Sequence, residues 1–579
     1  MSKLNIDQKS IKELFSDKKA DFLIPDYQRP YAWEEKECER LWDDIFEFAI
    51  PNNDASQFDR SSEYFLGPIV TFKNKDKKSE IIDGQQRLTT LLLLLRAFYS
   101  KGSKMQDDES KLARKAIEEC IWKTDEFNRA IMSELKIDSE VASDEEKDVF
   151  RNILKTGEVA DCEKGKYAAN YRFFCKKVVE FLFSYPSYFA HLPTRIMNNC
   201  IILPIEAESQ DTALRIFSTL NDRGKPLSDA DIFKAQFYKY YSNCGRKDEF
   251  IKRWKELETL CDTIFDPLHG TPMDEIFVRY MYFERAKRGI KDTTTEALRK
   301  FYEKDSYALL KSDATFDALN DLAQFWKSVA EQDDERFSPE VLRKLFVLSY
   351  APNGMWAYIA SVYYMQNRKP DGNLEEAPFL QFLDRITAYI WTYALINPGV
   401  NQLRTPMYAE MVKIIEGGEV DFEGMKIDRA QLDNAFRNYI FSNGRPITKS
   451  MLVWWAMRFD GQVLPEGNKA FEIEHIIARE RQSRDKVLSS SQKLESLGNK
   501  VILEKGINIR AADYRFKDKF KYYQGYESKG RKKGGTVVKE LLDFTATRTD
   551  FVESDVDKRF EDICCSFMKF VDDNKLFKS

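Results

Sequence analysis

Sulfur and imidazole side chains are scarce in this sequence. Its 579 residues include 9 cysteines and 3 histidines, and no two cysteines have the Cys-x-x-Cys spacing. The adjacent Cys564 and Cys565 suit neither a simple disulfide nor a zinc knuckle. We therefore expect no structural zinc, and the scattered thiols favour a reducing compartment in which they serve as small core residues.

Long apolar runs are also missing. The most apolar stretches, 91–95 and 451–457, are far shorter than the roughly 20 residues that a membrane-spanning helix needs. Residues 1–21 are polar and charged, unlike a secretory signal. These features predict a cytoplasmic protein with no membrane partner.

Charge of one sign is not in large excess, since the formal net charge is −5. The chain is therefore not basic throughout, and any contact with nucleic acid must come from local patches. Lysine and arginine do cluster at 517–521 and at 529–533. Either run alone could equally be a solvated surface loop.

The length of the chain suggests about three or four domains. Apolar periodicity predicts the following early elements: strands at 22–24, 64–72, 80–82 and 201–206, and helices at 34–49, 86–99 and 167–185. Residues 101–165 are charge-rich and weakly periodic, which predicts solvent-facing helices and loops. From about 235 to 455 the pattern predicts one helix after another.

The character of the sequence changes after a plausible linker at 461–467. The later elements that we expect are strands at 471–477 and 500–503 and helices at 516–523 and 556–571. The predicted fold class is therefore α+β and multidomain: an N-terminal α/β domain, a largely helical middle and a C-terminal domain set within helices. The expected domain boundaries are 1–235, 236–455 and 456–579.

His475 has the most suggestive surroundings of the three histidines. His191 and His269 lie in loop-like settings, whereas His475 follows two carboxylates in Phe471-Glu472-Ile473-Glu474-His475-Ile476-Ile477. Cleavage of a phosphodiester with one metal ion needs a neutral imidazole that takes a proton from water. It also needs carboxylate and amide oxygens that hold a hard cation such as Mg²⁺.

Two asparagines downstream complete such a set. Asn499 lies in Leu-Gly-Asn-Lys-Val-Ile-Leu and Asn508 in Gly-Ile-Asn. The spacing predicts a ββα hairpin in which His475 ends the first strand, Asn499 opens the second and Asn508 starts the helix. Because alternate residues of a strand share a face, a tight bend at His475 is needed to bring Glu474 beside it. Without the asparagines, the segment would be an ordinary strand with a surface histidine.

The combined pattern resembles the HNH nuclease family in its His-Asn-Asn form. The resemblance implies His475 as the general base, Glu474 and Asn508 as metal ligands and Asn499 as the residue that fixes the loop. Glu472 matches a further acidic position of the motif and is an additional candidate ligand. Ala478 stands where family members often have proline, which leaves the shape of the local loop open.

Two N-terminal segments also attract attention. Ile24-Pro25-Asp26-Tyr27-Gln28-Arg29-Pro30-Tyr31-Ala32-Trp33 is held extended by its prolines. Ile81-Ile82-Asp83-Gly84-Gln85-Gln86-Arg87-Leu88-Thr89-Thr90 places a strand, a glycine turn and a helix N-terminus in sequence, and a helix N-terminus attracts phosphate. Arginines could add contacts to the phosphate, and Tyr27, Tyr31 or Trp33 could stack on a base. An arginine-containing turn that caps a core helix explains the same residues.

Together these segments resemble the ParB/sulfiredoxin-like NTPase domain that accompanies HNH domains in GmrSD-type, modification-dependent (type IV) restriction enzymes. The resemblance covers residues from about 8 to 235 and from about 450 to 575. It implies that ATP or GTP is bound by the following residues: Gln28, Arg29, Asp83, Gly84, Gln85, Gln86, Arg87 and Thr89. The segment 221–228 resembles another element of that domain. The chain has no Walker-type phosphate loop.

The function that follows from both resemblances is restriction of foreign DNA. We expect an anti-phage endonuclease, regulated by a nucleoside triphosphate and dependent on a divalent cation, that cuts modified phage DNA and works as a monomer or a homodimer. Two alternatives stay open. One is a DNA-binding regulator or sensor with a degenerate HNH fold, and the other is a nuclease directed at RNA.

Overall fold

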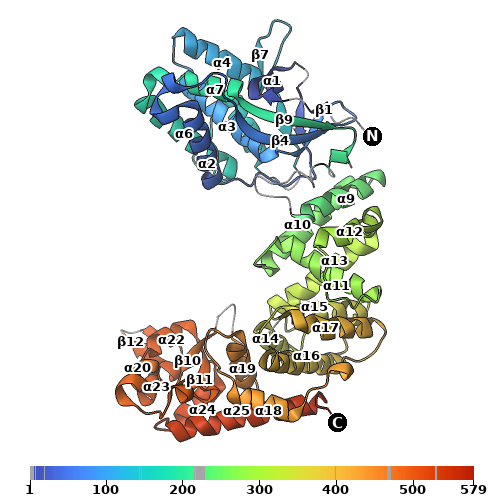
Figure 1. Cartoon of the computed structure of the whole chain (residues 1–579), viewed down its shortest axis with the longest axis vertical. Helices are drawn as coiled ribbons and strands as arrows, with labels where there is room; N and C mark the ends of the chain where they lie inside the picture. The colour runs from blue at the N-terminus through green and yellow to red at the C-terminus, as the bar shows by residue number, and fades with distance from the viewer. Residues whose placement is uncertain are drawn as a thin grey trace. The chain divides into compact units, whose positions relative to one another are not determined.

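The structure is a computed structural model of the whole chain, and it divides into two compact units, Met1–Lys255 and Glu256–Ser579 (Figure 1). The residues that it describes are 5–6, 8–18, 20–141, 144, 146–210, 212–213, 216, 228–397, 400–465, 471–528 and 531–578. Both units contain helices, and the sheet lies in the first, which confirms the predicted α+β, multidomain class. No described helix is long and apolar enough to cross a lipid bilayer.

The first unit alternates strands and helices. Its strands are β1 (Asn5–Ile6), β2 (Lys9–Ser10), β3 (Phe22–Ile24), β4 (Tyr64–Lys73), β5 (Ser79–Asp83), β6 (Trp122–Thr124), β7 (Ala130–Leu135), β8 (Ile137–Ser139) and β9 (Cys200–Ala207). Its helices are α1 (Ile11–Ser16), α2 (Glu35–Ala49), α3 (Gln85–Gly102), α4 (Asp108–Ile121), α5 (Lys147–Thr156), α6 (Lys166–Ser184), α7 (His191–Asn199) and α9 (Asp229–Asn243). Short 3₁₀ turns lie at Pro51–Asn53, Ala55–Gln57 and Pro186–Tyr188.

A mixed sheet forms the centre of this unit. In the described part of the chain it has seven strands in the order β1-β9-β4-β5-β3-β8, and β2 also pairs with β9. Strands β3, β5 and β8 are mutually parallel, whereas β4 is antiparallel to β5 and parallel to β9. Figure 1 shows α2, α3 and α6 gathered beside β4 and β9.

Alternation along the strands gives the sheet two apolar faces. In β4, Ile69 joins the large core that includes α3, whereas its neighbour Val70 packs with Ile82 and Ile205 on the other face. Successive side chains of a strand point to opposite faces, so adjacent apolar residues mark a strand that is covered on both sides. The sheet is therefore held between two layers.

Residues 101–165 are more ordered than the sequence indicated. The predicted solvent-facing helices and loops contain the β6–β7 hairpin, and β8 extends the central sheet beside β3. The strand β7 is largely exposed, and apolar and polar residues alternate only weakly along it. Its sequence pattern therefore gives little indication of a strand. The strand β8 pairs with β3, which is distant in the sequence, and a local pattern does not record such pairing.

The second unit is helical over most of its length, as the sequence predicted for 235–455. Its first helices are α10 (Lys247–Ile264, which begins in the first unit), α11 (Pro272–Lys287), α12 (Leu298–Tyr307), α13 (Asp313–Ala330), α14 (Pro339–Ser349), α15 (Met355–Asn367), α16 (Glu376–Ile396), α17 (Val400–Ile415), α18 (Arg429–Asn438) and α19 (Pro446–Ala456). Short 3₁₀ turns lie at Ala308–Leu310 and Glu423–Met425.

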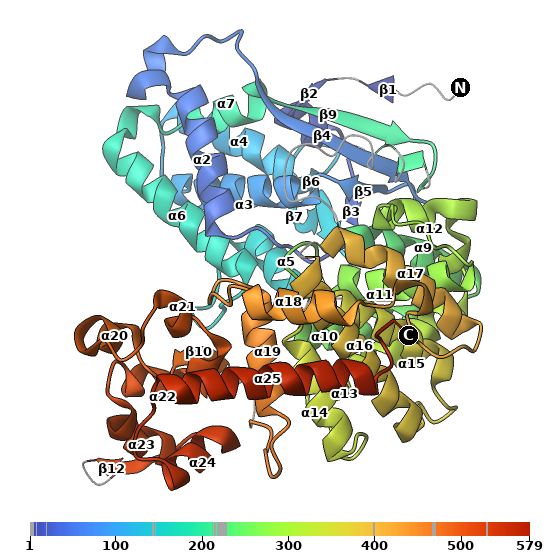
Figure 2. The ribbon, with the colours of Figure 1, turned by 60° about the horizontal axis from the view of Figure 1, so that its bottom comes forward.

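A small hairpin domain follows these helices. Its elements are β10 (Phe471–His475), α20 (Arg479–Asp485), α21 (Ser491–Leu494), a 3₁₀ turn at Leu497–Asn499, β11 (Lys500–Glu504), α22 (Lys505–Ala511), α23 (Phe516–Gln524), β12 (Tyr526–Ser528), β13 (Arg531–Lys533), α24 (Lys539–Thr547) and α25 (Glu553–Asp573). The long α25 contacts the 3₁₀ turn before β11 and also α16 and α18, so it joins the hairpin to the helices of its unit (Figure 2).

Candidate functional site

The two N-terminal segments meet because β3 and β5 are neighbouring parallel strands. Each segment begins where its strand ends, and the carboxyl ends of parallel strands lie at one edge of the sheet. Gln85 Nε2 donates to Gln28 Oε1 at 3.3 Å and to the Arg29 carbonyl at 3.5 Å. Gln28 Nε2 in turn donates to the Ile82 carbonyl at 3.4 Å. The structure therefore brings the two motifs together.

Gln86 fixes the extended segment from the side of α3. Its Oε1 accepts the backbone N–H groups of Ala32 at 2.7 Å and Trp33 at 3.3 Å, and its Nε2 donates to the Pro30 carbonyl at 3.2 Å. The side chain is 8 % exposed. Gln86 thus supplies hydrogen bonds to a stretch of backbone that belongs to no sheet or helix.

Gly84 is required at the start of α3. Its φ of +91° lies in the left-handed region, and a Cβ there would collide with the Ile69 side chain. The turn leaves the first N–H groups of α3 beside Asp83 and Arg87, whose charged groups lie 3.7 Å apart. Arg87 Nη1 also donates to the Leu66 carbonyl at 2.9 Å.

Burial governs the charges of this pair. It raises the pKa of the Asp83 carboxyl, although Arg87 acts in the opposite direction. It lowers the pKa of the Arg87 guanidinium, although Asp83 again opposes the change. A positive φ of +109° at Gly67 places that residue so close to the guanidinium that a Cβ would meet Arg87 Nη1 at 2.5 Å. The pair and the helix N-terminus form a compact polar corner at the end of β5.

Other N-terminal candidates lie deeper than the sequence indicated. The expectation that Tyr27 or Tyr31 stacks on a base is wrong for this structure, because both are buried and their rings pack on Tyr238 and Tyr167. Thr89 is 1 % exposed within α3, and Trp33 is half-buried. Residues 221–227 of the further predicted element lie outside the described residues, and Ser228 at its end caps α9.

The C-terminal hairpin pairs β10 with β11 in antiparallel register, and His475 stands opposite Lys500. Asn499 closes the long loop between the strands. Its Oδ1 accepts the Ile477 N–H at 2.8 Å, and its Nδ2 donates to the carbonyls of Ile477 at 3.2 Å and Leu494 at 3.0 Å. These contacts are the ones that a loop-fixing asparagine makes.

The chain bends directly after His475, whereas the sequence predicted a bend at His475 itself. The strand pairing continues in regular register through His475, and the chain bends at Ile476 and Ile477. Glu472 and Glu474 therefore share one face of β10, and His475 points to the other. Asn508 also differs from its expected place, since α22 begins at Lys505 and Asn508 lies within it.

The first face of the hairpin holds two distinct carboxylates. Asn508 Nδ2 lies 3.3 Å from Glu472 Oε2, so the structure brings these two candidate ligands together. Glu474 instead pairs with Lys519 of α23, whose Nζ lies 2.5 Å from Glu474 Oε1 and also donates to the His475 carbonyl at 2.9 Å. Burial raises the pKa of Glu474, and Lys519 acts against that shift.

The second face holds His475, which is 8 % exposed. Its Nε2 lies 3.6 Å from Glu495 Oε1 and has no hydrogen-bond partner among the described residues. Burial and the neighbouring Lys500 lower the pKa of His475 to about 4, and Glu495 opposes this shift. The imidazole is therefore neutral near neutral pH, which is the form that can accept a proton.

The buried ion pair of Arg559 and Glu540 supports the end of the loop between β10 and β11. Arg559 of α25 pairs with Glu540 at 2.7 Å and donates to the carbonyls of Leu497 at 2.6 Å and Lys500 at 2.6 Å. Trp455 Nε1 of α19 donates to the same Glu540 at 2.8 Å. A Cβ at Gly498 would collide with the α25 backbone at Val556, so that glycine is needed for the close approach.

Sequence reasoning missed Glu495, Lys500, Lys519 and Arg559. Lys500 stood inside the quoted motif, and Lys519 lay in a basic run that favoured a surface position, yet both are 0 % exposed. Their partners come from distant parts of the chain, so no local pattern marks them. His191, which looked loop-like, begins α7, whereas His269 does lie in a loop.

The donors near α22 suit a hard cation, because Glu472 and Asn508 offer oxygens and a site with few protein ligands and several waters is typical of Mg²⁺. No group of three or more His, Cys, Asp or Glu side chains within the described residues is arranged to hold a metal ion. A cation would therefore be held by one carboxylate, Glu472, and one amide, Asn508. Glu474 could bind the cation only if the cation replaced Lys519 as its partner.

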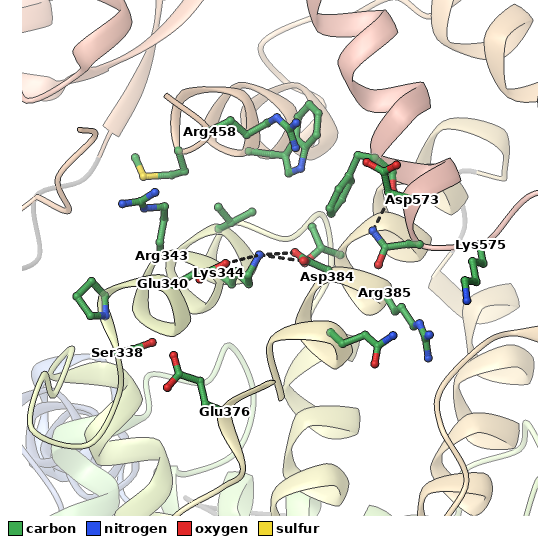
Figure 3. A pocket seen from close by; sticks show the side chains of 18 residues that line it. Ser338, Glu340, Arg343, Lys344, Glu376, Asp384, Arg385, Arg458, Asp573 and Lys575 are labelled. Atoms are coloured by element: carbon green, nitrogen blue, oxygen red, sulfur yellow. Dashed lines mark hydrogen bonds and ion pairs between the residues drawn. The ribbon is translucent and has the colours of Figure 1, made fainter. Parts of the chain in front are cut away.

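A separate pocket of about 1010 Å³ lies among α14, α16, α19 and α25 (Figure 3). Lys344 lies at its centre and contacts Asp384 at 2.8 Å, and Arg458 lies over the Trp454 ring at 4.7 Å from its centroid. None of the residues predicted for either site lines this pocket. The pocket is therefore distinct from both candidate sites.

These features describe a multidomain α+β protein. It has a polar corner in the first unit and, in the second, a hairpin whose loop is held by hydrogen bonds of Asn499. Residues 11–238 match the family model of the GmrSD restriction endonuclease N-terminal domain. The match places a domain of this family in the N-terminal part of the chain, where the motif resemblance predicted it. No curated protein sequence matches the chain.

Proposed function

We propose that this protein is an HNH-type DNA endonuclease whose C-terminal hairpin hydrolyses phosphodiesters with the help of a divalent cation. The observation that carries the proposal is the hairpin itself. His475 ends β10, Asn499 locks the intervening loop by three hydrogen bonds, and Asn508 in the following helix lies beside Glu472. The match of residues 11–238 to a restriction endonuclease N-terminal domain supports DNA as the substrate.

In this proposal His475 is the general base. The imidazole is neutral near neutral pH and would take the proton of the attacking water. Asn508 and Glu472 would hold Mg²⁺ or a similar cation on the face of β10 opposite His475, and Glu474 would join them only on release from Lys519. Such a cation would supply charge stabilisation to the scissile phosphate. Asn499 keeps the loop that follows His475 in place. Arg559 donates to the backbone carbonyls of Leu497 and Lys500, which flank Asn499.

The N-terminal corner is the proposed site for ATP or GTP. The N-terminus of α3 attracts a phosphate, and Arg87 and Arg29 add positive charge from the two motif segments. Gln28, Gln85 and Gln86 hold those segments together and so fix the shape of the corner. Nucleotide binding there would regulate cutting of modified phage DNA in the cytoplasm, and a homodimer would allow both strands to be cut.

The test is plasmid and modified phage DNA incubated with Mg²⁺, with and without ATP or GTP. We expect cleavage by the wild type, a loss of roughly 10²–10⁴-fold in His475→Ala, and no loss in His269→Ala, which alters an exposed loop histidine. Equal cleavage by the wild type and His475→Ala would refute the role of His475. An RNA panel under the same conditions separates restriction of DNA from cleavage of RNA.

One observation favours a second candidate function, a DNA-binding sensor with a degenerate hairpin. Lys519 neutralises Glu474, the residue that the HNH resemblance gives as a metal ligand. A degenerate hairpin would bind DNA yet give no nicking at any concentration of Mg²⁺ or Mn²⁺. Metal-dependent nicking by the wild type decides for the endonuclease.

A further inference from the structure

Glu495 is the carboxylate that faces the candidate base. It lies in the loop between β10 and β11, directly after α21, and its Oε1 is 3.6 Å from His475 Nε2. That nitrogen is buried and has no hydrogen-bond partner within the described residues. A buried imidazole N–H without an acceptor is costly, and a carboxylate at this distance needs only a small movement to accept it.

Two cations hold Glu495 in place. Lys500 Nζ lies 2.6 Å from Glu495 Oε2, and Arg479 contacts Glu495 Oε1 through Nη2 at 2.7 Å and Nε at 3.1 Å. Lys500 is itself 0 % exposed and also donates to the Phe441 carbonyl at 2.5 Å. The carboxylate is therefore positioned from two sides by two positively charged side chains.

A neutral imidazole carries one proton, and the group beside one ring nitrogen decides which nitrogen keeps it. A carboxylate accepts hydrogen bonds and donates none, so Glu495 stabilises the tautomer with the proton on Nε2. That tautomer leaves Nδ1 free to accept a proton. The same contact fixes the plane of the ring.

We propose that Glu495 is the positioning residue for His475: held by Lys500 and Arg479, it selects the Nε2–H tautomer and so presents Nδ1 as the proton acceptor. This inference rests on the proposed function for its catalytic consequence. Its structural content, the tautomer of one buried histidine, is independent of any cleavage.

The low number of histidines makes the tautomer measurable. In protein labelled with ¹⁵N-histidine, the 3 imidazoles give separate long-range proton–nitrogen patterns, and His475→Ala removes the one that belongs to His475. We expect the Nε2–H pattern for His475 in the wild type. Glu495→Ala should convert it to a mixture of tautomers. Glu480→Ala, which removes an exposed carboxylate of α20, should leave it unchanged.

Cleavage kinetics provide the second readout. In Glu495→Ala we expect kcat to fall by roughly 10–100-fold, the usual effect of removing a carboxylate that orients a functional histidine, with KM unchanged. Glu495→Gln keeps the size of the side chain and serves as the variant least disturbing to the fold. It should lower kcat in the same direction.

The outcomes separate the two proposals. An unchanged His475 tautomer in folded Glu495→Ala and Glu495→Gln overturns the positioning role, whatever the cleavage rate. A wild type that shows the Nε2–H tautomer, lost in Glu495→Ala, yet cleaves no nucleic acid with Mg²⁺, supports the positioning role and refutes the endonuclease. A rise in KM at constant kcat contradicts positioning, because it would place Glu495 in substrate binding.

Discussion

In the N-terminal corner the glutamine side chains of the motifs hydrogen-bond to each other and to nearby backbone beside one ion pair, Asp83 with Arg87, whereas the C-terminal hairpin holds several ion pairs. Gln28, Gln85 and Gln86 belong to the first kind. Glu474 with Lys519, and Glu495 with Lys500, belong to the second. Loss of one partner therefore has different consequences: a neutral amide leaves unmade hydrogen bonds, but a buried ion leaves an uncompensated charge.

The residues of a sequence motif can serve the architecture of the fold or the chemistry of a site. The Asp-Gly-Gln-Gln-Arg segment owes its residue types partly to architecture, since Gly84 provides a left-handed turn and Gln86 fixes a strand-like segment. In the hairpin, His475 Nε2 is buried and has no hydrogen-bond partner among the described residues. Buried polar groups without partners are uncommon in folded proteins and call for an explanation, which the proposed catalytic role would give.

The largest effect should come from removing the cation at Glu474. Lys519→Met keeps most of the side-chain length but leaves a buried carboxylate without its partner, so we expect a loss of about 3–5 kcal/mol in the free energy of unfolding. Urea denaturation of the full chain measures this loss. Lys517→Met, on an exposed turn of the same helix, should change stability by no more than about 0.5 kcal/mol.

The double variant Glu474→Gln/Lys519→Met checks the cause. Because it removes both charges, it should recover most of the stability lost in the single variant. A Lys519→Met protein as stable as Lys517→Met would mean that the hairpin does not depend on paired charges, and the contrast between the two sites would fail.

A smaller effect is expected from pH, with opposite signs in the two sites. The folded-state pKa of His475, about 4, lies below the unfolded value of about 6.5, so the unfolded chain binds this proton first. The contribution of His475 is therefore full above about pH 6.5 and is lost as the pH falls toward 4, by about 3 kcal/mol in all. Burial raises the pKa of Asp83, so its contribution is present below the unfolded pKa and is lost as the pH rises.

The measurement is the free energy of unfolding at several pH values without divalent cations, for the wild type, His475→Asn and Asp83→Asn. His475→Asn should flatten the decline on acidification, and Asp83→Asn should steepen it. Identical pH dependence in all three proteins would show that neither buried group differs from its unfolded state.

Much of the fold follows from the sequence because it rests on local periodicity. The strand at 64–72, the helix at 86–99 and the helical run from 235 to 455 show their apolar faces in the chain itself, and the structure confirms them. The β6–β7 hairpin was missed because polar and apolar residues alternate only weakly along β7, and β8 was missed because its partner β3 is distant in the sequence. The three-domain boundaries and the site assignments stay predictions.

The site was predictable in its residue types and order but not in its pairings. The sequence places His475, Asn499 and Asn508 at the spacing of a hairpin. It gives no sign that Lys519 reaches Glu474 or that Glu495 reaches His475, because these contacts depend on how α23 and the intervening loop fold back. The meeting of the N-terminal motifs was open in the sequence and becomes evident once β3 and β5 are seen to be parallel neighbours.

The smallest effect should come from the amide network. Gln86→Ala leaves two backbone N–H groups and the Pro30 carbonyl without their side-chain partner, and we expect a loss of about 1–3 kcal/mol in the free energy of unfolding. It should also weaken binding of ATP or GTP, because the segment that carries Arg29 is then no longer fixed against α3. Gln57→Ala, whose amide is exposed and contacts only its neighbours in the chain, is the matched control. If Gln86→Ala binds nucleotide as tightly as Gln57→Ala while losing stability, Gln86 has an architectural role alone, and nucleotide recognition belongs to Arg87 and the helix N-terminus.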